Sequence, residues 1–175
     1  MRIIAGTLKG RRLRAPDGLS VRPTADRARE ALFSVLQKWP RGAFLDLFGG
    51  TGAVALEAFS RGYAPVACVE KDPQALACLK ANLRGAELAI LAQDVMRLGA
   101  DAFRDQAVIF LDPPYAAWTE TWAALAPRLG TWLAPTGVLV FETAAGTAFP
   151  PCPDLEPLEV RRYGAAEFHL FRRPG

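Results

Sequence analysis

The chain has 175 residues, of which 51% are hydrophobic and 22% are charged, so its length suits one domain and its composition excludes a disordered or fibrous protein. No apolar run approaches the ~18 residues that a membrane-spanning helix needs, and the N-terminus M-R-I-I-A-G lacks the apolar core of a signal peptide. We therefore expect a cytoplasmic protein with no membrane partner.

The net charge of +3 is unevenly distributed along the chain. Residues 1–29 contain eight Lys or Arg and two Asp, a net of +6, which leaves −3 on the remainder. A basic segment on a mildly acidic body favours a polyanionic partner such as a nucleic acid. The alternative is a solvated surface in an arginine-rich sequence, because arginine outnumbers lysine 17 to 4.

The first half of the chain predicts a hairpin, a helix and the start of a strand–helix alternation. Residues 2–14 alternate loosely around a glycine-bearing turn, which predicts a short β-hairpin that displays basic side chains. A helix follows, with Thr24 as its N-cap and Asp26 in its first turn. Strands are then expected at 43–48, 65–70 and 87–94, and helices at 50–62 and 73–83.

The alternation continues to the end of the chain. The apolar run 107–112 predicts a fourth strand, 119–133 a helix with a proline irregularity, and 137–143 a fifth strand. The tail predicts an antiparallel pair of strands around Gly164. Strands that alternate with helices indicate a parallel, doubly wound sheet, and strands without polar alternation indicate helices on both of its faces.

These elements predict an α/β fold with a mostly parallel seven-stranded sheet, an antiparallel C-terminal strand and an N-terminal β-hairpin. We expect two units: a basic hairpin extension over residues 1–20 and the α/β domain over 21–175. The three cysteines, Cys68, Cys78 and Cys152, form no C-x-x-C pair, so free thiols and no metal site are expected. The single histidine, His169, lies in an apolar stretch and favours a structural role.

Four of the predicted strands end on or next to an acid. Asp46 precedes the glycine-rich loop G-G-T-G, and Glu70 closes the next strand, 18 residues after Gly52. Asp94 and Asp112 follow the third and fourth strands. In such a sheet ligands bind beyond the carboxyl ends of the strands, and glycines let a ligand approach the main chain closely. An acid at Glu70 can accept both hydroxyls of a ribose, and Asp94 is placed to meet the edge of a purine.

Two kinds of nucleoside ligand are compatible with this loop. G-T-G-A-V-A formally matches the dinucleotide fingerprint, which would indicate a nicotinamide-dependent oxidoreductase. Such an enzyme would need a catalytic Tyr–Lys pair or a histidine and would leave D-P-P-Y, residues 112–115, without a purpose. Asp46 suits an amino group better than a phosphate, so S-adenosylmethionine fits better. The alternative is that these acids merely cap helices or pair with arginines.

The same motifs resemble those of known methyltransferases. D-L-F-G-G-T-G, Glu70, Asp94 and D-P-P-Y, in this order, resemble motifs I to IV of the class I S-adenosylmethionine-dependent methyltransferases. R-P-T-A-D-R-A-R-E-A-L-F and E-A-F-S-R-G resemble the bacterial small-subunit (16S) ribosomal RNA guanine-N2 methyltransferases of the RsmD type. The resemblance covers essentially the whole chain. It implies a Rossmann-like fold, S-adenosylmethionine as cofactor, and a monomer that acts on 16S rRNA within a small-subunit assembly intermediate.

The resemblance also implies roles for individual residues. Asp112, Pro113, Pro114 and Tyr115 would be catalytic: the Asp112 carboxylate and the Pro113 carbonyl accept the N–H groups of the amine, and Tyr115 stacks on the base or covers the cofactor. The cofactor-binding set comprises Thr24, Asp46, Leu47, Phe48, Gly49, Gly50, Thr51, Gly52, Glu70, Lys71, Asp94 and Val95. The phosphate-binding set for RNA comprises Arg2, Lys9, Arg11, Arg12, Arg14 and Arg22.

Two other functions remain open. An adenine-N6 methyltransferase acting on DNA or RNA would share D-P-P-Y, but a DNA enzyme usually carries a separate target-recognition segment, for which 175 residues leave little room. A non-enzymatic RNA-binding protein would use the basic segment but would not need the acids at the strand ends.

Overall fold

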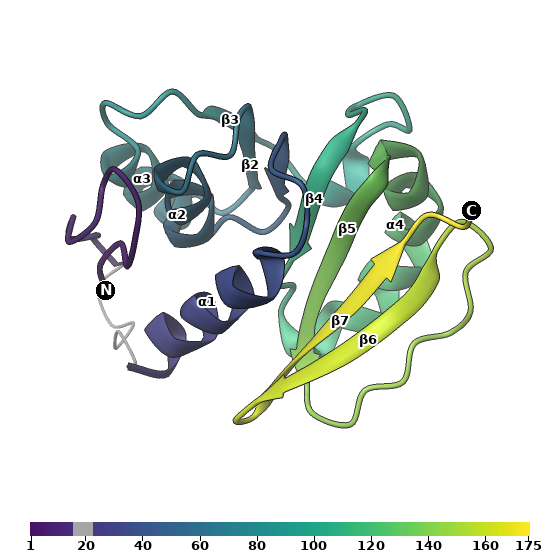
Figure 1. The fold of residues 1–175 in the computed structure, drawn as a ribbon. Coiled ribbons are helices and arrows are strands. Elements are labelled where there is room, and N and C mark those ends of the chain that lie inside the picture. Colours follow the sequence, from purple (N-terminus) through teal and green to yellow (C-terminus); the bar gives the residue numbers. More distant parts are fainter. Residues whose placement is uncertain (16–22) are drawn as a thin grey trace.

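The computed structural model of the chain describes residues 1–15 and 23–175 (Figure 1). In this part of the chain seven strands form one sheet in the order β3-β2-β1-β4-β5-β7-β6. Strands β1 to β5 are parallel, and β7 is antiparallel to both β5 and β6. The strands are β1 (Phe44–Asp46), β2 (Val66–Glu70), β3 (Ala89–Ala92), β4 (Gln106–Leu111), β5 (Leu133–Ala144), β6 (Glu156–Tyr163) and β7 (Ala166–Arg172). The predicted α/β class and mostly parallel sheet are confirmed.

The helices lie where the sequence predicts them, with shifted ends. They are α1 (Pro23–Leu36), α2 (Ala53–Ser60), α3 (Pro73–Asn82) and α4 (Trp118–Trp132), with short 3₁₀ turns η1 (Val95–Arg97) and η2 (Tyr115–Ala117). The prediction that Thr24 is the N-cap is wrong, because α1 already begins at Pro23. Proline is favoured in the first turn, where its missing N–H has no helical partner. Asp26 lies in that first turn, as expected.

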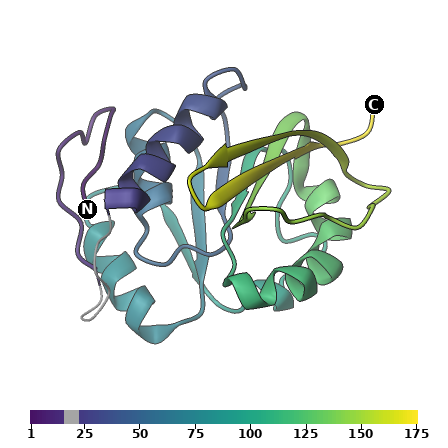
Figure 2. The same cartoon turned by 90° about the horizontal axis from the view of Figure 1, so that it is seen from below.

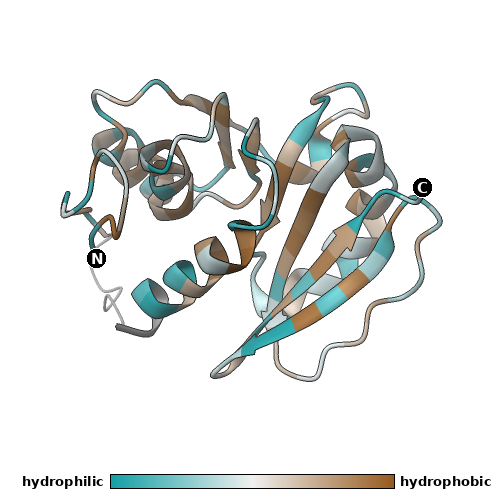
Figure 3. Cartoon of the chain, viewed as in Figure 1, coloured by the Kyte–Doolittle hydropathy of each residue, from teal (hydrophilic) through white to brown (hydrophobic). Residues whose placement is uncertain are grey.

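The sheet separates two apolar cores. Successive strand residues face opposite sides, so Phe44 and Val108 pack with α1, α2 and α3, whereas Leu45 and Ile109 pack with α4. Figure 2 shows α1 and α4 on opposite faces of the sheet. Every residue of β1 and β4 is buried, which explains why these strands lack polar alternation, and Figure 3 shows the hydrophobic middle of β5 between the two layers.

The N-terminal segment, residues 1–15, forms a loose hairpin without regular strands, in which the N–H groups of Ile3, Gly10 and Leu13 donate to the carbonyls of Arg11, Ile3 and Met1. One antiparallel bridge joins Arg2 and Arg12, and no strand is assigned within residues 1–15. Ile3 and Leu13 are buried in the core that α1, α2 and α3 share. The segment therefore packs against the α/β domain. The expected boundary at residue 20 lies outside the described residues.

The remaining reactive side chains are dispersed. Cys68 is buried, Cys78 and Cys152 are half-buried, and all three thiols are free. His169 is buried in β7, with its Nε2 3.4 Å from Glu167 Oε2 and its ring against Phe149, and burial lowers its pKa. Among the described helices, none combines the length and apolar character required to cross a membrane.

Candidate active site

The carboxyl ends of β1 to β5 share one edge of the sheet because these strands are parallel. Asp46 and Glu70 are the last residues of β1 and β2, and Asp112 directly follows β4. Asp94 lies beyond β3, where it caps η1 by accepting a hydrogen bond from the Met96 N–H. The structure therefore brings the four predicted acids to one edge.

A fifth acid at this edge, Glu142, was missed in the sequence. It lies inside β5, two residues before the strand ends, and lines the same cavity as Asp46 and Asp112. The available signal was a single charged residue within the otherwise apolar run G-V-L-V-F-E-T. A strand covered on both faces rarely buries an acid without a reason.

The glycine-rich loop turns closely between β1 and α2. A Cβ on Gly49 would lie 2.0 Å from Cys68 Sγ, and one on Gly52, whose φ is +79°, would lie 2.5 Å from Leu79 Cδ1. Packing therefore requires glycine at both positions, and the left-handed backbone conformation requires it at Gly52 as well. The N–H groups of Gly49, Gly50 and Gly52 donate to Val69 O, Glu70 Oε2 and Gly49 O. These bonds hold the loop against β2 and occupy three of its donors.

A cavity of about 220 Å³ lies between this loop, α1 and the ends of β4 and β5. Asp46 in its wall is only 1% exposed, and its Oδ1 has no hydrogen-bond partner within the described residues. Burial, followed by the charges of Asp112 and Glu70, raises the pKa of Asp46 to about 7. Hydrogen bonds from the backbone N–H groups of Phe48 and Ala55 act in the opposite direction but do not offset the rise. Because an unpartnered buried carboxylate is costly, this position suits a ligand that brings a cation or an N–H donor.

The predicted adenosine-side residues lie beside the cavity and do not line it. Glu70 accepts hydrogen bonds from the N–H groups of Gly50, Lys71 and Asp72. Lys71 Nζ lies 3.0 Å from Asp94 Oδ2, and this bond lowers the pKa of Asp94.

Two other members of the predicted sets lie in the core, and two lie outside the described part of the chain. Leu47 and Val95 are buried in the core under α4, so their side chains cannot contact a ligand at this edge. Arg22 lies outside the described residues, as does the side chain of Thr24.

The tetrapeptide D-P-P-Y forms the rigid turn after β4. The Pro114 carbonyl accepts a hydrogen bond from the Ala117 N–H at 2.8 Å, whereas no backbone N–H of the described residues donates to the Pro113 carbonyl. Asp112 is accessible from the cavity mouth, yet the protein around its other sides raises its pKa to about 6. Tyr115 is 54% exposed, and burial, Glu142 and Asp112 raise its pKa. An accessible acid that lines the cavity, a carbonyl without a backbone donor among the described residues and an exposed ring thus follow one another in this turn.

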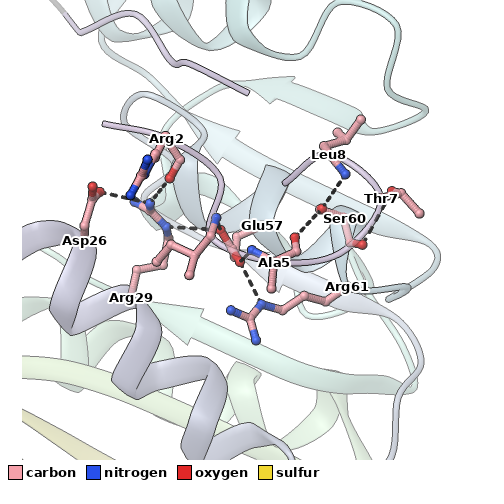
Figure 4. Close-up of polar contacts among 10 residues, drawn as sticks. Arg2, Ala5, Thr7, Leu8, Asp26, Arg29, Glu57, Ser60 and Arg61 are labelled. Carbon is pink, nitrogen blue, oxygen red and sulfur yellow. Dashed lines mark hydrogen bonds and ion pairs between the residues drawn. The ribbon is translucent and has the colours of Figure 1, made fainter. Parts of the chain in front are cut away.

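A buried ion network lies beneath the N-terminal segment (Figure 4). Glu57 on α2 is fully buried and accepts hydrogen bonds from the N–H groups of Ile4 and Ala5 and from Arg61 Nε. Arg29 on α1 lies 3.5 Å from Glu57 through its Nε, and its Nη2 donates to the Arg2 carbonyl.

The motif E-A-F-S-R-G, residues 57–62, anchors the N-terminal segment, a role that the sequence had not revealed. Ser60 Oγ donates to the Ala5 carbonyl and accepts from the Leu8 N–H (Figure 4). Together with Glu57, it uses main-chain groups of residues 4–8 that a regular hairpin would pair internally. Arg29 and Met1 also line the cavity, so this network joins the basic segment to the site.

The predicted phosphate-binding residues differ in their surroundings. Arg11 Nη2 donates to the carbonyls of Asn82 and Arg84 at the end of α3, at 2.8 and 2.6 Å. Its guanidinium therefore has a structural contact that the sequence did not indicate. The predicted cations that remain exposed on the described segment are Arg2, Lys9, Arg12 and Arg14.

A sheet of this order, with a glycine-rich loop after its first strand and acids at the ends of successive strands, is the fold of the class I S-adenosylmethionine-dependent methyltransferases. The sequence profile of the family described as Conserved hypothetical protein 95 matches residues 1–172, and the chain belongs to this family.

Named relatives and a solved structure agree with this assignment. The chain is 32% identical to the Ribosomal RNA small subunit methyltransferase D of Escherichia coli strain K12, over 99% of this chain and 90% of the relative. It is also 32% identical to the Haemophilus influenzae protein of the same name, over 82% and 78% of the two chains. The solved structure of a hypothetical protein of Thermus thermophilus superposes with a TM-score of 0.83 and 32% identity, covering 98% of this chain and 99% of that chain.

Proposed function

We propose that this chain transfers a methyl group from S-adenosylmethionine to the exocyclic N2 amine of a guanine in small-subunit (16S) ribosomal RNA. Family membership and the relatives named for small-subunit rRNA methylation support the reaction class. The observation that carries the chemistry is the cavity in which the buried Asp46 and the accessible Asp112 face one space. An acid for the cofactor and an acid for the target amine then lie on neighbouring strands.

The residues around the cavity fit the cofactor. The cofactor supplies a methyl group on a positively charged sulfur and carries an amino acid tail. The unpartnered Oδ1 of Asp46 suits the ammonium of that tail, and the main chain of residues 48–52 lies alongside. Glu70, already oriented by the Gly50 N–H, would accept the ribose hydroxyls. Asp94, paired with Lys71, and the main chain of Val95 would meet the adenine.

The turn after β4 would activate the target amine. A guanine 2-amino group is a poor nucleophile because its lone pair is delocalised into the ring. The Asp112 carboxylate and the Pro113 carbonyl would accept its two N–H bonds and favour the tetrahedral nitrogen that attacks the methyl group. Pro113 and Pro114 hold these acceptors in place, so positioning supplies most of the catalysis. Tyr115 would stack on a base presented outside its helix.

The basic N-terminal segment would bind the RNA backbone. The exposed Arg2, Lys9, Arg12 and Arg14 lie on a segment that is anchored beside the cavity, which supports phosphate contacts from these side chains. Arg22 completes the proposed set. We further propose a monomer that acts in the cytoplasm on a partly assembled small subunit, in which the target base is still accessible.

Methyl transfer from labelled S-adenosylmethionine to small subunits, naked rRNA and duplex DNA tests the proposal. We expect label on the N2 atom of guanine, in RNA only. Asp112→Ala should lower kcat by ~10²–10⁴-fold while leaving cofactor affinity within ~3-fold, because the acid acts on the amine. Asp101→Ala, which removes an exposed acid of a distant loop, is the control and should keep wild-type activity. Absence of transfer to any RNA would overturn the proposal, and label on adenine N6 would favour the adenine-specific alternative.

A further inference from the structure

Glu142 is an acid of the site to which the proposed chemistry assigns no role. Phe141 pairs with Leu111 in the parallel ladder between β5 and β4, so the next residues on the two strands, Glu142 and Asp112, lie side by side. Neighbouring strands are ~4.8 Å apart, and both side chains line the same cavity. The two carboxyl groups therefore face one ligand.

The surroundings of Glu142 contain acids and apolar groups. Burial, and then the charge of Asp112, raise the pKa of Glu142 to about 8, and no hydrogen bond or cation of the described residues offsets this shift. Its partner on β7, Phe168, is apolar. Of the other titratable groups, Tyr115 faces both acids, and Asp46 and Arg29 line the cavity.

Two adjacent carboxyl groups in a partly dry cavity cannot both ionise at low cost. At neutral pH the pair therefore retains a proton in the free protein. A ligand that offers two adjacent N–H donors would allow both groups to ionise. The Watson–Crick edge of guanine has this arrangement, because its N1–H adjoins the 2-amino group.

We propose that Glu142 selects guanine, by accepting the N1–H of the target base while Asp112 accepts an N–H of the adjacent 2-amino group. This inference rests on the proposed function. Adenine carries a lone pair at N1, which an ionised Glu142 repels. The protonated acid would instead donate to this lone pair, so the discrimination should be strongest above the pKa of Glu142, about 8. A site built to accept an N–H strongly rejects an analogue that lacks it, since its own buried group then stays unpaired.

The test replaces the mapped target guanine by 2-aminopurine in ligated small-subunit RNA. This base keeps the 2-amino group but has a lone pair in place of the N1–H. At pH 9, above the pKa of Glu142, the wild-type protein should prefer guanine by ~10²-fold or more in kcat/KM. The amide of Glu142→Gln can accept the N1–H of guanine or donate to N1 of 2-aminopurine, so its preference should fall to about tenfold or less.

A preference ratio that Glu142→Gln leaves at the wild-type value would overturn the inference, because a merely structural role would slow both substrates alike. Glu156→Gln, an exposed change at the opposite edge of the sheet, is the matched control and should keep the wild-type ratio. Thermal unfolding of both variants verifies that they are folded. If the wild-type protein leaves guanine unmethylated, the proposed function itself is overturned, and this inference with it.

Discussion

Glu57 and Asp46 are both buried, but the protein provides donors and counter-charges for only one of the two carboxylates. Glu57 binds two main-chain N–H groups and pairs with Arg29 and Arg61. Asp46 has an unpartnered oxygen, and burial together with nearby acids raises its pKa to about 7. A buried carboxylate costs several kcal/mol unless donors and cations surround it. We therefore assign the first acid to folding and propose that the second binds a ligand.

The largest expected effect is on the satisfied acid. Glu57→Gln should lower the free energy of unfolding by ~3–5 kcal/mol, because the buried Arg29 would lose its one fully buried counter-charge and keep only its ion pair with the partly exposed Asp26. Urea denaturation measures the loss. Glu120→Gln, on the exposed side of α4, should change it by less than ~0.5 kcal/mol. A loss for Glu57→Gln no larger than this control would show that the network does not anchor the fold.

Asp46→Asn should act in two opposite directions. Removal of a charge that the protein does not satisfy should stabilise the fold at pH 8 by ~1–3 kcal/mol. The same change should weaken cofactor binding ~10–100-fold, because a hydrogen bond to a charged group is lost. Thermal unfolding and titration calorimetry with S-adenosylmethionine measure the two effects. If Asp46→Asn instead destabilises the protein, Asp46 stabilises the fold as Glu57 does, and the distinction between the two acids fails.

The pH dependence should follow from the unsatisfied acids. The pKa of Asp46 rises from 3.8 to about 7 on folding, so between these values the folded chain binds more protons than the unfolded chain. Stability contributed by this group is thus complete below about pH 4 and falls as pH rises toward 7. In the proposed site the ammonium of the cofactor binds ionised Asp46, so cofactor affinity should fall by up to ~tenfold per pH unit below pH 7. In Asp46→Asn, neither stability nor cofactor affinity should depend on pH in this way. If either dependence persists, it belongs to other titratable groups.

The smallest effect is expected at the basic segment. The double change Lys9→Gln and Arg12→Gln should weaken RNA binding ~3–10-fold and reduce the slope of log affinity against log salt by about 2. Filter binding at several salt concentrations measures this slope. Arg11→Gln is the contrast, because its guanidinium binds the end of α3, and it should lower stability by ~1 kcal/mol. An unchanged slope in the double variant would show that Lys9 and Arg12 do not bind RNA phosphates and would favour a role in solubility.

Local signals in the sequence were sufficient for the fold class and for four of the acids. Apolar runs, glycines and prolines report the nearby backbone, so they located Asp46, Glu70, Asp94 and Asp112 at or just beyond the strand ends. The same signals predicted the antiparallel turn of the N-terminal segment but not its attachment to α2. Its main-chain N–H groups bond to α2 side chains about fifty residues away, which no local pattern reports.

The sequence by itself determined that Asp46, Glu70, Asp94 and Asp112 lie at the edge of the sheet, because strand ends are set by neighbours along the chain. Only the tertiary structure decided which acids have partners. Glu57 meets Arg29 from another helix, and Glu142 meets Asp112 across two strands. Whether a buried charge is satisfied depends on the groups that folding brings around it, and this separates the acid that holds the fold from those that we propose bind a ligand.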